Sequence, residues 1–185
     1  MRVERQDDTM TGKEKIYIER QKNYTTHRGS FGPTGSISAN GCGAIALYNV
    51  LMYFGIRAEF MTIVKRFSRL WPLALSCGGC MGTYITHLHY ELRRYKFSVH
   101  PVFFTKRVVK NFHLDEHSAF IFLYGWKKKR KLGAHYQAGF GNPDGTITLH
   151  NPKATYFGIA DLLKEKRKKE KMWFCMALMI RKKNR

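Results

Sequence analysis

The spacing of the apolar residues changes character near residue 96. Before that point, apolar side chains recur every three or four residues, which predicts helices over residues 42–54, 59–70 and 83–95. After it, short apolar or alternating runs are typical of strands. Helices that come first and strands that come second predict an α+β domain, with the helices packed on an antiparallel sheet.

The second half of the chain carries the expected strands. Residues 97–104 contain Pro101, which favours an edge strand or a bulge. Residues 134–140 and 146–150 flank the turn sequence Gly141-Asn142-Pro143-Asp144-Gly145, and this pattern predicts a hairpin. Two further strands are expected at residues 118–124 and 173–180, and a short helix is expected at residues 158–168.

The chain has 185 residues, of which 44% are hydrophobic, and this predicts one domain with an ordinary core. Residues 1–30 are polar, highly charged and without periodicity, so we expect a loose arm there and the folded domain over residues 31–185. No apolar run approaches the roughly 18 residues of a membrane span, and no secretory signal is evident. Four cysteines are too few for a disulfide framework, so a reducing, cytoplasmic setting is expected.

The net charge is +20, from 33 Lys and Arg against 13 Asp and Glu. Such a charge attracts anionic partners: an acidic protein, nucleic acid or a lipid surface. Cations cluster at residues 127–131, 164–171 and 181–185. Solvated loops and helix faces give the same pattern, and no zinc finger or aromatic RNA-binding motif accompanies the charge. The charge alone therefore leaves the partner open.

Cys42 lies at the start of the first predicted helix. Asn40 is a suitable N-cap, so Cys42 falls in the first turn. There, unpaired N–H groups and the helix dipole favour a thiolate over a thiol. Cys42 is therefore a candidate nucleophile, although most free cysteines are simply small buried residues.

A thiol nucleophile needs a base that takes its proton and later protonates the leaving group. The predicted hairpin singles out His135 near the start of one strand and Asn151 directly after the other. If residues 141–145 form the loop, Phe140 faces Thr146, and counting outward places His135 directly opposite Asn151. A four-residue loop would instead turn Asn151 to the other face. The five-residue loop places five side chains on one face: His135, Gln137, Ile147, Leu149 and Asn151.

Three stretches together resemble the papain-like cysteine peptidases. They are Asn40-Gly41-Cys42-Gly43-Ala44-Ile45-Ala46-Leu47-Tyr48-Asn49, the later Gly133-Ala134-His135-Tyr136, and Leu149-His150-Asn151-Pro152. The likeness is closest to the compact bacterial type related to the double-glycine leader peptidases of bacteriocin exporters. It extends from about Ser36 to the last predicted strand.

This resemblance implies a papain-like fold, in which a central helix carries the cysteine and packs on an antiparallel sheet. It implies that Cys42 is the nucleophile, His135 the general base and acid, and Asn151 the residue that orients the imidazole. It also implies that neither a metal nor an organic cofactor takes part.

One departure from the family concerns the oxyanion hole. The family usually has a glutamine six residues before the cysteine, and this chain has Ser36 there. Losing such a donor typically costs on the order of 10²- to 10³-fold in rate. Asn40 is an alternative amide donor beside the Cys42 N–H, although an N-capping role would compete for its side chain. His113 and His117 are rival bases, but both lie in a charged loop.

The remaining cysteines have simpler interpretations. Cys77 and Cys80 have the two-residue spacing of a zinc knuckle or a redox pair. His87 and His89 follow closely, but two residues apart in a helix they would face different directions. A plain Gly-rich loop bordering the substrate cleft is therefore favoured over a zinc site, and Cys175 is expected to pack in the core.

The sequence thus predicts a thiol hydrolase that acts on a peptide or isopeptide amide, with an acidic substrate or partner. Two other functions remain open. One is a catalytically weak or inactive module of the same fold that binds nucleic acid or another polyanion. The other is transfer or deamidation chemistry on the same Cys–His pair, because an acyl-enzyme can react with other nucleophiles.

Overall fold

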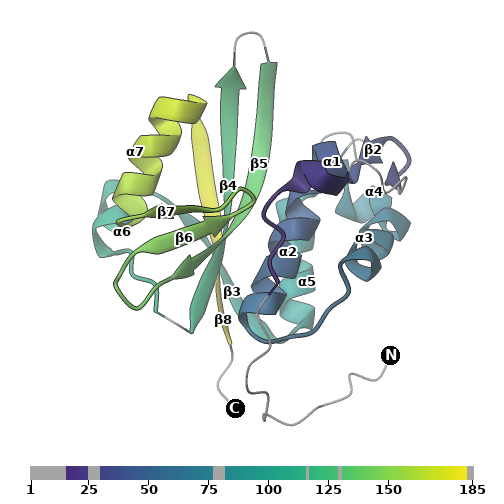
Figure 1. The fold of residues 1–185 in the computed structure, drawn as a ribbon, viewed down its shortest axis with the longest axis horizontal. Helices are drawn as coiled ribbons and strands as arrows, with labels where there is room; N and C mark the ends of the chain where they lie inside the picture. The colour runs from purple at the N-terminus through teal and green to yellow at the C-terminus, as the bar shows by residue number, and fades with distance from the viewer. Residues whose placement is uncertain (1–15, 25–29, 77–81, 116, 129–130, 183–185) are drawn as a thin grey trace.

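The fold centres on a six-stranded antiparallel sheet with the strand order β3-β8-β4-β5-β6-β7 (Figure 1). The computed structural model describes residues 16–24, 30–76, 82–115, 117–128 and 131–182. The strands of the sheet are β3 (Phe97–Phe103), β4 (Ser118–Lys128), β5 (Lys131–Gly141), β6 (Ile147–His150), β7 (Ala154–Tyr156) and β8 (Phe174–Lys182). β3 pairs with β8 alone at the sheet edge, as Pro101 predicts.

Helices cover both faces of the sheet (Figure 1). One face carries the 3₁₀ helix η1 (Gln21–Tyr24) and the helices α1 (Ile37–Asn40), α2 (Cys42–Tyr53), α3 (Phe60–Arg69), α4 (Trp71–Ala74) and α5 (Ile85–Arg94). The opposite face carries α6 (Lys106–Asn111) and α7 (Ile159–Glu170). A two-stranded sheet, β1 (Ser30–Phe31) with β2 (Gly35–Ser36), lies on the helical side. The α+β architecture expected from the apolar spacing is confirmed.

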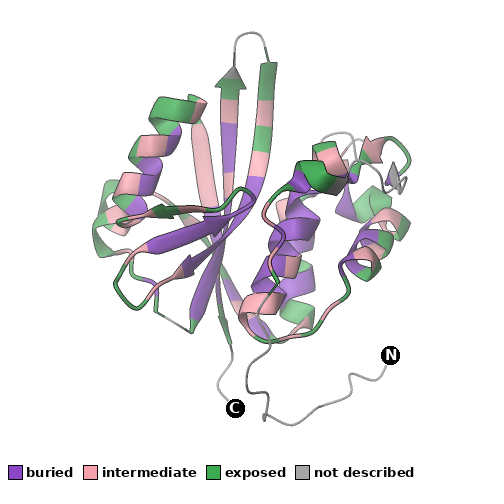
Figure 2. Cartoon of the chain, viewed as in Figure 1, coloured by how far each residue is buried: buried purple, intermediate pink, exposed green. Residues whose placement is uncertain are grey.

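Each face of the sheet has its own apolar core. On the α2 side, α2 is buried nearly all round, because the sheet lies behind it and α3 and α5 cover it (Figure 2). On the other side, α7 packs Leu162 and Leu163 against Phe120 and Phe122 of β4. Successive strand residues point to opposite faces, so β4 contributes to both cores.

The three helices predicted from apolar spacing are all present, with small differences at their ends. The expected apolar face of α3 is buried, from Phe60 to Phe67. α5 begins at Ile85 rather than at the predicted Thr83. Thr83 instead forms an isolated β-bridge with Leu75, which places it outside the helix.

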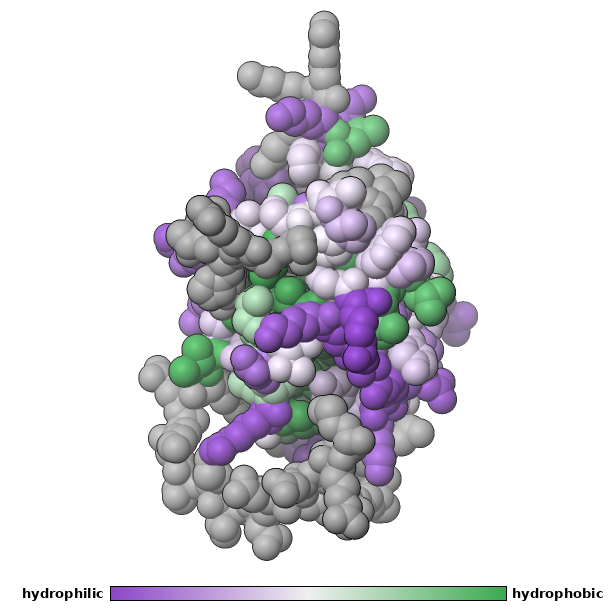
Figure 3. Space-filling model, turned by 90° about the vertical axis from the view of Figure 1, so that its right-hand side faces the viewer, coloured by the Kyte–Doolittle hydropathy of each residue, from purple (hydrophilic) through white to green (hydrophobic). Residues whose placement is uncertain are grey.

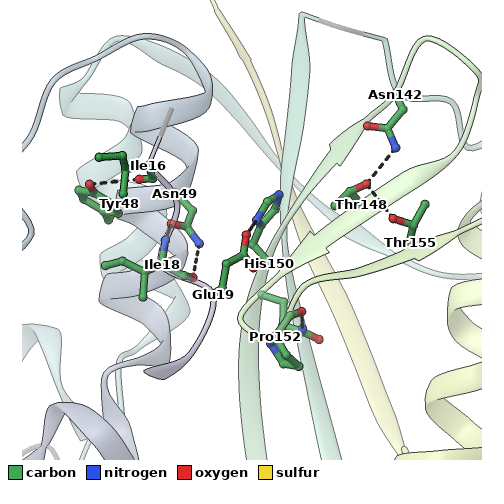
Figure 4. A network of polar contacts seen from close by, with 11 residues as sticks. Ile16, Ile18, Glu19, Tyr48, Asn49, Asn142, Thr148, His150, Pro152 and Thr155 are labelled. Atoms are coloured by element: carbon green, nitrogen blue, oxygen red, sulfur yellow. Dashed lines mark hydrogen bonds and ion pairs between the residues drawn. The ribbon is translucent and has the colours of Figure 1, made fainter. Parts of the chain in front are cut away.

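Residues 16–24 form a packed strap rather than the loose arm expected over residues 1–30. The side-chain amide of Asn49 on α2 bonds both the N–H of Ile18 (2.9 Å) and its carbonyl (3.1 Å). On the other side of the strap, Glu19 Oε1 lies 2.6 Å from His150 Nδ1 on β6 (Figure 4). The strap is held by these polar contacts and by Ile18, which is buried in the core. This stretch is too short to show apolar periodicity in the sequence.

Candidate active site

Cys42 occupies the first turn of α2, as predicted. The prediction that Asn40 is the N-cap of this helix is wrong. The N-cap is Gly41, which makes no side-chain bond. Asn40 belongs to the preceding short helix α1, where its Oδ1 lies 3.5 Å from the N–H of Ser36. Gly43 lets Thr83 pack directly on this turn, because a Cβ there would lie 2.7 Å from the Thr83 side chain. The thiol is consequently only 6% exposed.

Burial decides the protonation state of Cys42. Desolvation raises the pKa of the thiol above its ordinary value. The backbone N–H dipoles of Tyr136, Gly43 and Cys42 lower the pKa, but burial is the larger effect. Cys42 is therefore protonated at neutral pH. The thiolate expected from its position at the helix start is not favoured, because the side chain is buried.

The start of α2 lies against β5, the strand that carries His135, and the Tyr136 N–H on that strand lowers the pKa of the Cys42 thiol. β6 pairs with β5 only from Ala138 to Gly141, so Tyr136 falls on the part of the β5 edge that β6 leaves uncovered. Folding thus brings the start of α2 next to the strand that carries His135.

The predicted register of the hairpin is wrong by two residues. Gly141 pairs with Ile147 and Phe140 with Thr148, so His135 is not directly opposite Asn151. The loop still has five residues, 142–146 instead of 141–145, and a shift of two preserves the faces. His135 nevertheless meets Asn151, whose backbone is in the left-handed conformation (φ 69°) just after β6. The His135 Nε2 and the Asn151 carbonyl oxygen are 2.8 Å apart.

This hydrogen bond fixes the tautomer of His135. A carbonyl oxygen only accepts, so Nε2 carries the proton and Nδ1 carries the lone pair. The imidazole is therefore oriented by the main chain of Asn151. The side chain of Asn151 is engaged elsewhere: its Oδ1 accepts from the Gln21 N–H (2.9 Å), and its Nδ2 donates to Gln21 Oε1 (3.3 Å).

The fold and this pairing can now be compared with known proteins. No family model matches the sequence, and no match is found among curated proteins. Among solved structures, the chain is similar to the peptidase domain of Streptococcus ComA, a bi-functional ABC transporter involved in a quorum sensing pathway. The TM-score is 0.50 at 14% identity, and the match covers 83% of this chain and 99% of that domain. This chain has the papain-like fold.

The papain-like fold expected from the three motifs is thereby confirmed. Among the described residues, no helix combines the length and the apolar character needed to cross a membrane.

Burial also keeps His135 neutral. Desolvation lowers the pKa of the imidazole, and the nearby Lys166 ammonium lowers it further. The bond to the Asn151 carbonyl and the Glu170 carboxylate act in the opposite direction, but burial is the largest cause. At neutral pH the ring is an unprotonated base with its lone pair on Nδ1.

Ser36 and Asn40, the two candidate oxyanion residues, differ in the hydrogen bonds that their side chains make. Ser36 is exposed and caps α1: its hydroxyl accepts from the Ala39 N–H (3.3 Å) and lies 3.3 Å from the Ser38 hydroxyl. Asn40 lies two residues before Cys42 and directs its Oδ1 back to Ser36. Asn40 thus places a side-chain amide on the chain segment that leads to the thiol.

The other sequence-predicted groups lie apart from this pair. His113 and His117 are exposed ahead of β4, and His117 is about 20 Å along that strand from Tyr124, which pairs with His135. Cys175 packs against the core on the α7 side, as expected. Cys77 and Cys80 lie outside the described residues. Within the described ranges, no group of three or more His, Cys, Asp or Glu side chains could hold a metal ion.

Two hollows lie on the helical side, where hydrophilic side chains lie over patches of apolar surface (Figure 3). A groove of about 390 Å³ between α3 and α5 is lined by Ile63, Phe67 and Arg94, among others. A second hollow of about 390 Å³ lies between the strap and α2. Neither is lined by Cys42 or His135, so neither belongs to the candidate active site.

Proposed function

We propose that this protein is a cysteine peptidase, or a related amide hydrolase, that works through an acyl-enzyme on Cys42. His135 is the general base and acid, and Asn151 orients it. The observation that carries the proposal is the 2.8 Å bond from His135 Nε2 to the Asn151 carbonyl, since it leaves Nδ1 free to accept a proton. The packing of α2, which begins with Cys42, on β5, which carries His135, supports the same pairing.

The proposed reaction begins from a neutral thiol and a neutral imidazole. Nδ1 of His135 takes the thiol proton as the sulfur attacks the carbonyl carbon of the scissile amide. The tetrahedral intermediate collapses when Nδ1–H gives that proton to the leaving amine, and the C–N bond breaks. Water, activated by the same nitrogen, then hydrolyses the thioester and restores the thiol.

The proposed substrate is a peptide with acidic residues near the cleaved bond. Lys127 and Lys131 are exposed at the end of the β4–β5 hairpin that carries His135, only a few residues along the strand from it. Cations at that distance attract an anionic peptide and raise its local concentration. The same cations would serve the alternative function, a polyanion-binding module without turnover.

We assign the oxyanion hole to the Cys42 N–H and the Asn40 Nδ2. Asn40→Ala is expected to slow acylation on the order of 10²- to 10³-fold, the usual cost of one oxyanion donor. Ser36→Ala is the matched control, because the Ser36 hydroxyl caps α1 and contacts the Ser38 hydroxyl within the same helix. Single-turnover rates of both variants would check this. An equal loss in Ser36→Ala would point to disruption of α1 instead of loss of an oxyanion donor.

The pH profile of Cys42 acylation tests the hydrolase proposal. The probe is a peptide ending in Gly-Gly with an electrophilic C-terminus, and peptide mapping identifies the modified cysteine. Because the pKa of His135 is lowered, its base form is present from below pH 6.5 upward. Because the pKa of Cys42 is raised above 9.0, free thiolate contributes only at higher pH. The rate should therefore be nearly constant between these two values.

A thiol without a base would behave differently. Its rate would climb about tenfold per pH unit throughout this range, following the thiolate fraction. Cys175 is the internal control, since its pKa is also raised by burial. Equally slow modification of Cys42 and Cys175 would contradict the hydrolase and favour the polyanion-binding module.

A further inference from the structure

Lys166 differs from the other cations of α7. Lys164, Arg167, Lys168 and Lys169 are exposed, whereas Lys166 is only 6% exposed. Its ammonium group lies 2.6 Å from Gln137 Oε1 and 3.3 Å from the Tyr124 hydroxyl. It also lies 4.6 Å from the centre of the Tyr124 ring. Burying a lysine is costly unless its contacts compensate, so these contacts mark a specific role for this side chain.

The contact with Lys166 orients the amide of Gln137. An ammonium group only donates, so the Gln137 oxygen must face Lys166 and its nitrogen must face the other way. Nε2 accordingly donates to the Pro152 carbonyl, 3.2 Å away. Gln137 is fully buried. It therefore links α7 on one side to the turn after β6 on the other.

The same turn holds His135. The Asn151 carbonyl accepts from His135 Nε2, and the next carbonyl, that of Pro152, accepts from Gln137. Gln21 of the strap holds the Asn151 side chain from the opposite direction. The two carbonyls are adjacent in the chain, so a displacement of one moves the other.

We propose that Lys166 is a positioning residue for His135: through Gln137 it fixes the Asn151–Pro152 turn that holds the imidazole in its Nε2–H tautomer. This inference deepens the proposed function and rests on it for its role in turnover. The charged and titratable groups around the ring include Lys166 and Glu170 from α7 and Tyr124 from β4. Of these groups, Lys166 is connected to the turn by the Gln137 bonds given above.

Nitrogen-15 NMR of the His135 ring tests the proposal at one fixed pH, in two variants. Lys166→Met removes the ammonium group. Gln137→Glu keeps an acceptor for Lys166 but removes the donor to Pro152, because a carboxylate only accepts. Both variants should lose the strong preference for the Nε2–H tautomer. Both should also acylate Cys42 about ten- to a hundred-fold more slowly, as expected for a misplaced base.

Lys168→Met is the matched control, because it removes the same charge from the exposed face of the same helix. It should leave the tautomer and the rate unchanged. Wild-type tautomer populations in folded Gln137→Glu would overturn the proposal, even if Lys166→Met failed to fold. The readout does not depend on turnover: if the wild type never acylates, the proposed function fails, while a tautomer change in the variants still supports the positioning role.

Discussion

His135→Ala is expected to slow acylation of Cys42 at pH 7 by about 10²- to 10⁴-fold, the usual contribution of a general base. The reason is the buried thiol. A thiol whose pKa lies above 9.0 is less than about 1% ionised at pH 7, so without His135 the reaction depends on that small thiolate fraction. The measurement is the single-turnover rate with the Gly-Gly probe, with the modified residue identified by peptide mapping.

A control variant and a rescue experiment test whether the loss of rate in His135→Ala is due to the missing imidazole. His113→Ala removes an exposed histidine from the loop before β4 and should leave the rate unchanged. Added imidazole should restore part of the rate of His135→Ala, because it can replace the missing base in the space left by the ring. A variant that retained the wild-type rate would show that another group takes the proton, and the assignment of His135 would fail.

The sequence singles out the residues proposed to react more readily than it shows what holds them in place. Cys42, His135 and Asn151 stand in short motifs, so a pattern could find them. The hydrogen bond from His135 to Asn151 could not be predicted from the sequence, because its acceptor is a backbone carbonyl and every residue has one. It depends on a left-handed residue after β6 and on a register two residues from the predicted one.

The supporting side chains were missed for a related reason. Lys166 lies within a run of cations whose other members are exposed, and nothing in the sequence separates it from them. Gln21 lies in a polar segment without periodicity, yet it is only 8% exposed and bonds Asn151. Buried polar side chains with long-range partners leave no local pattern.

The fold was predictable where elements are long. α2, α3 and α5 each extend for three turns or so, enough for apolar spacing to distinguish them from strands. The short elements β1, β2, α1 and α4 have two to four residues each, too few to show a period. Cys42 thus sits at the junction of a predictable helix, α2, and an unpredictable one, α1, and this explains why its N-cap was misassigned.

Gly139→Ala is expected to have the largest effect on stability, about 3 kcal/mol, because overpacking a filled core costs this much at its upper range. A Cβ on Gly139 would clash with the ring edge of Phe120 on β4 and would lie 2.8 Å from Leu149 on β6. Both neighbours are fully buried and have no space to move into. In a chain of this size, such a loss lowers the Tm by roughly 6–12 °C, which a thermal melt would measure.

Gly145→Ala is the control for Gly139→Ala, because it tests the cost of backbone strain without a packing clash. A Cβ there has open space around it, and the cost comes only from the left-handed backbone (φ 81°), about 1 kcal/mol. Phe120→Leu in the Gly139→Ala background should recover part of the stability, since it removes the ring that the new methyl group meets. If the double variant were no more stable than Gly139→Ala, the clash with Phe120 would not be the cause. Gly139 lies on β5, which pairs with β6, and β6 leads to Asn151, so the packing at Gly139 also bears on how His135 is held.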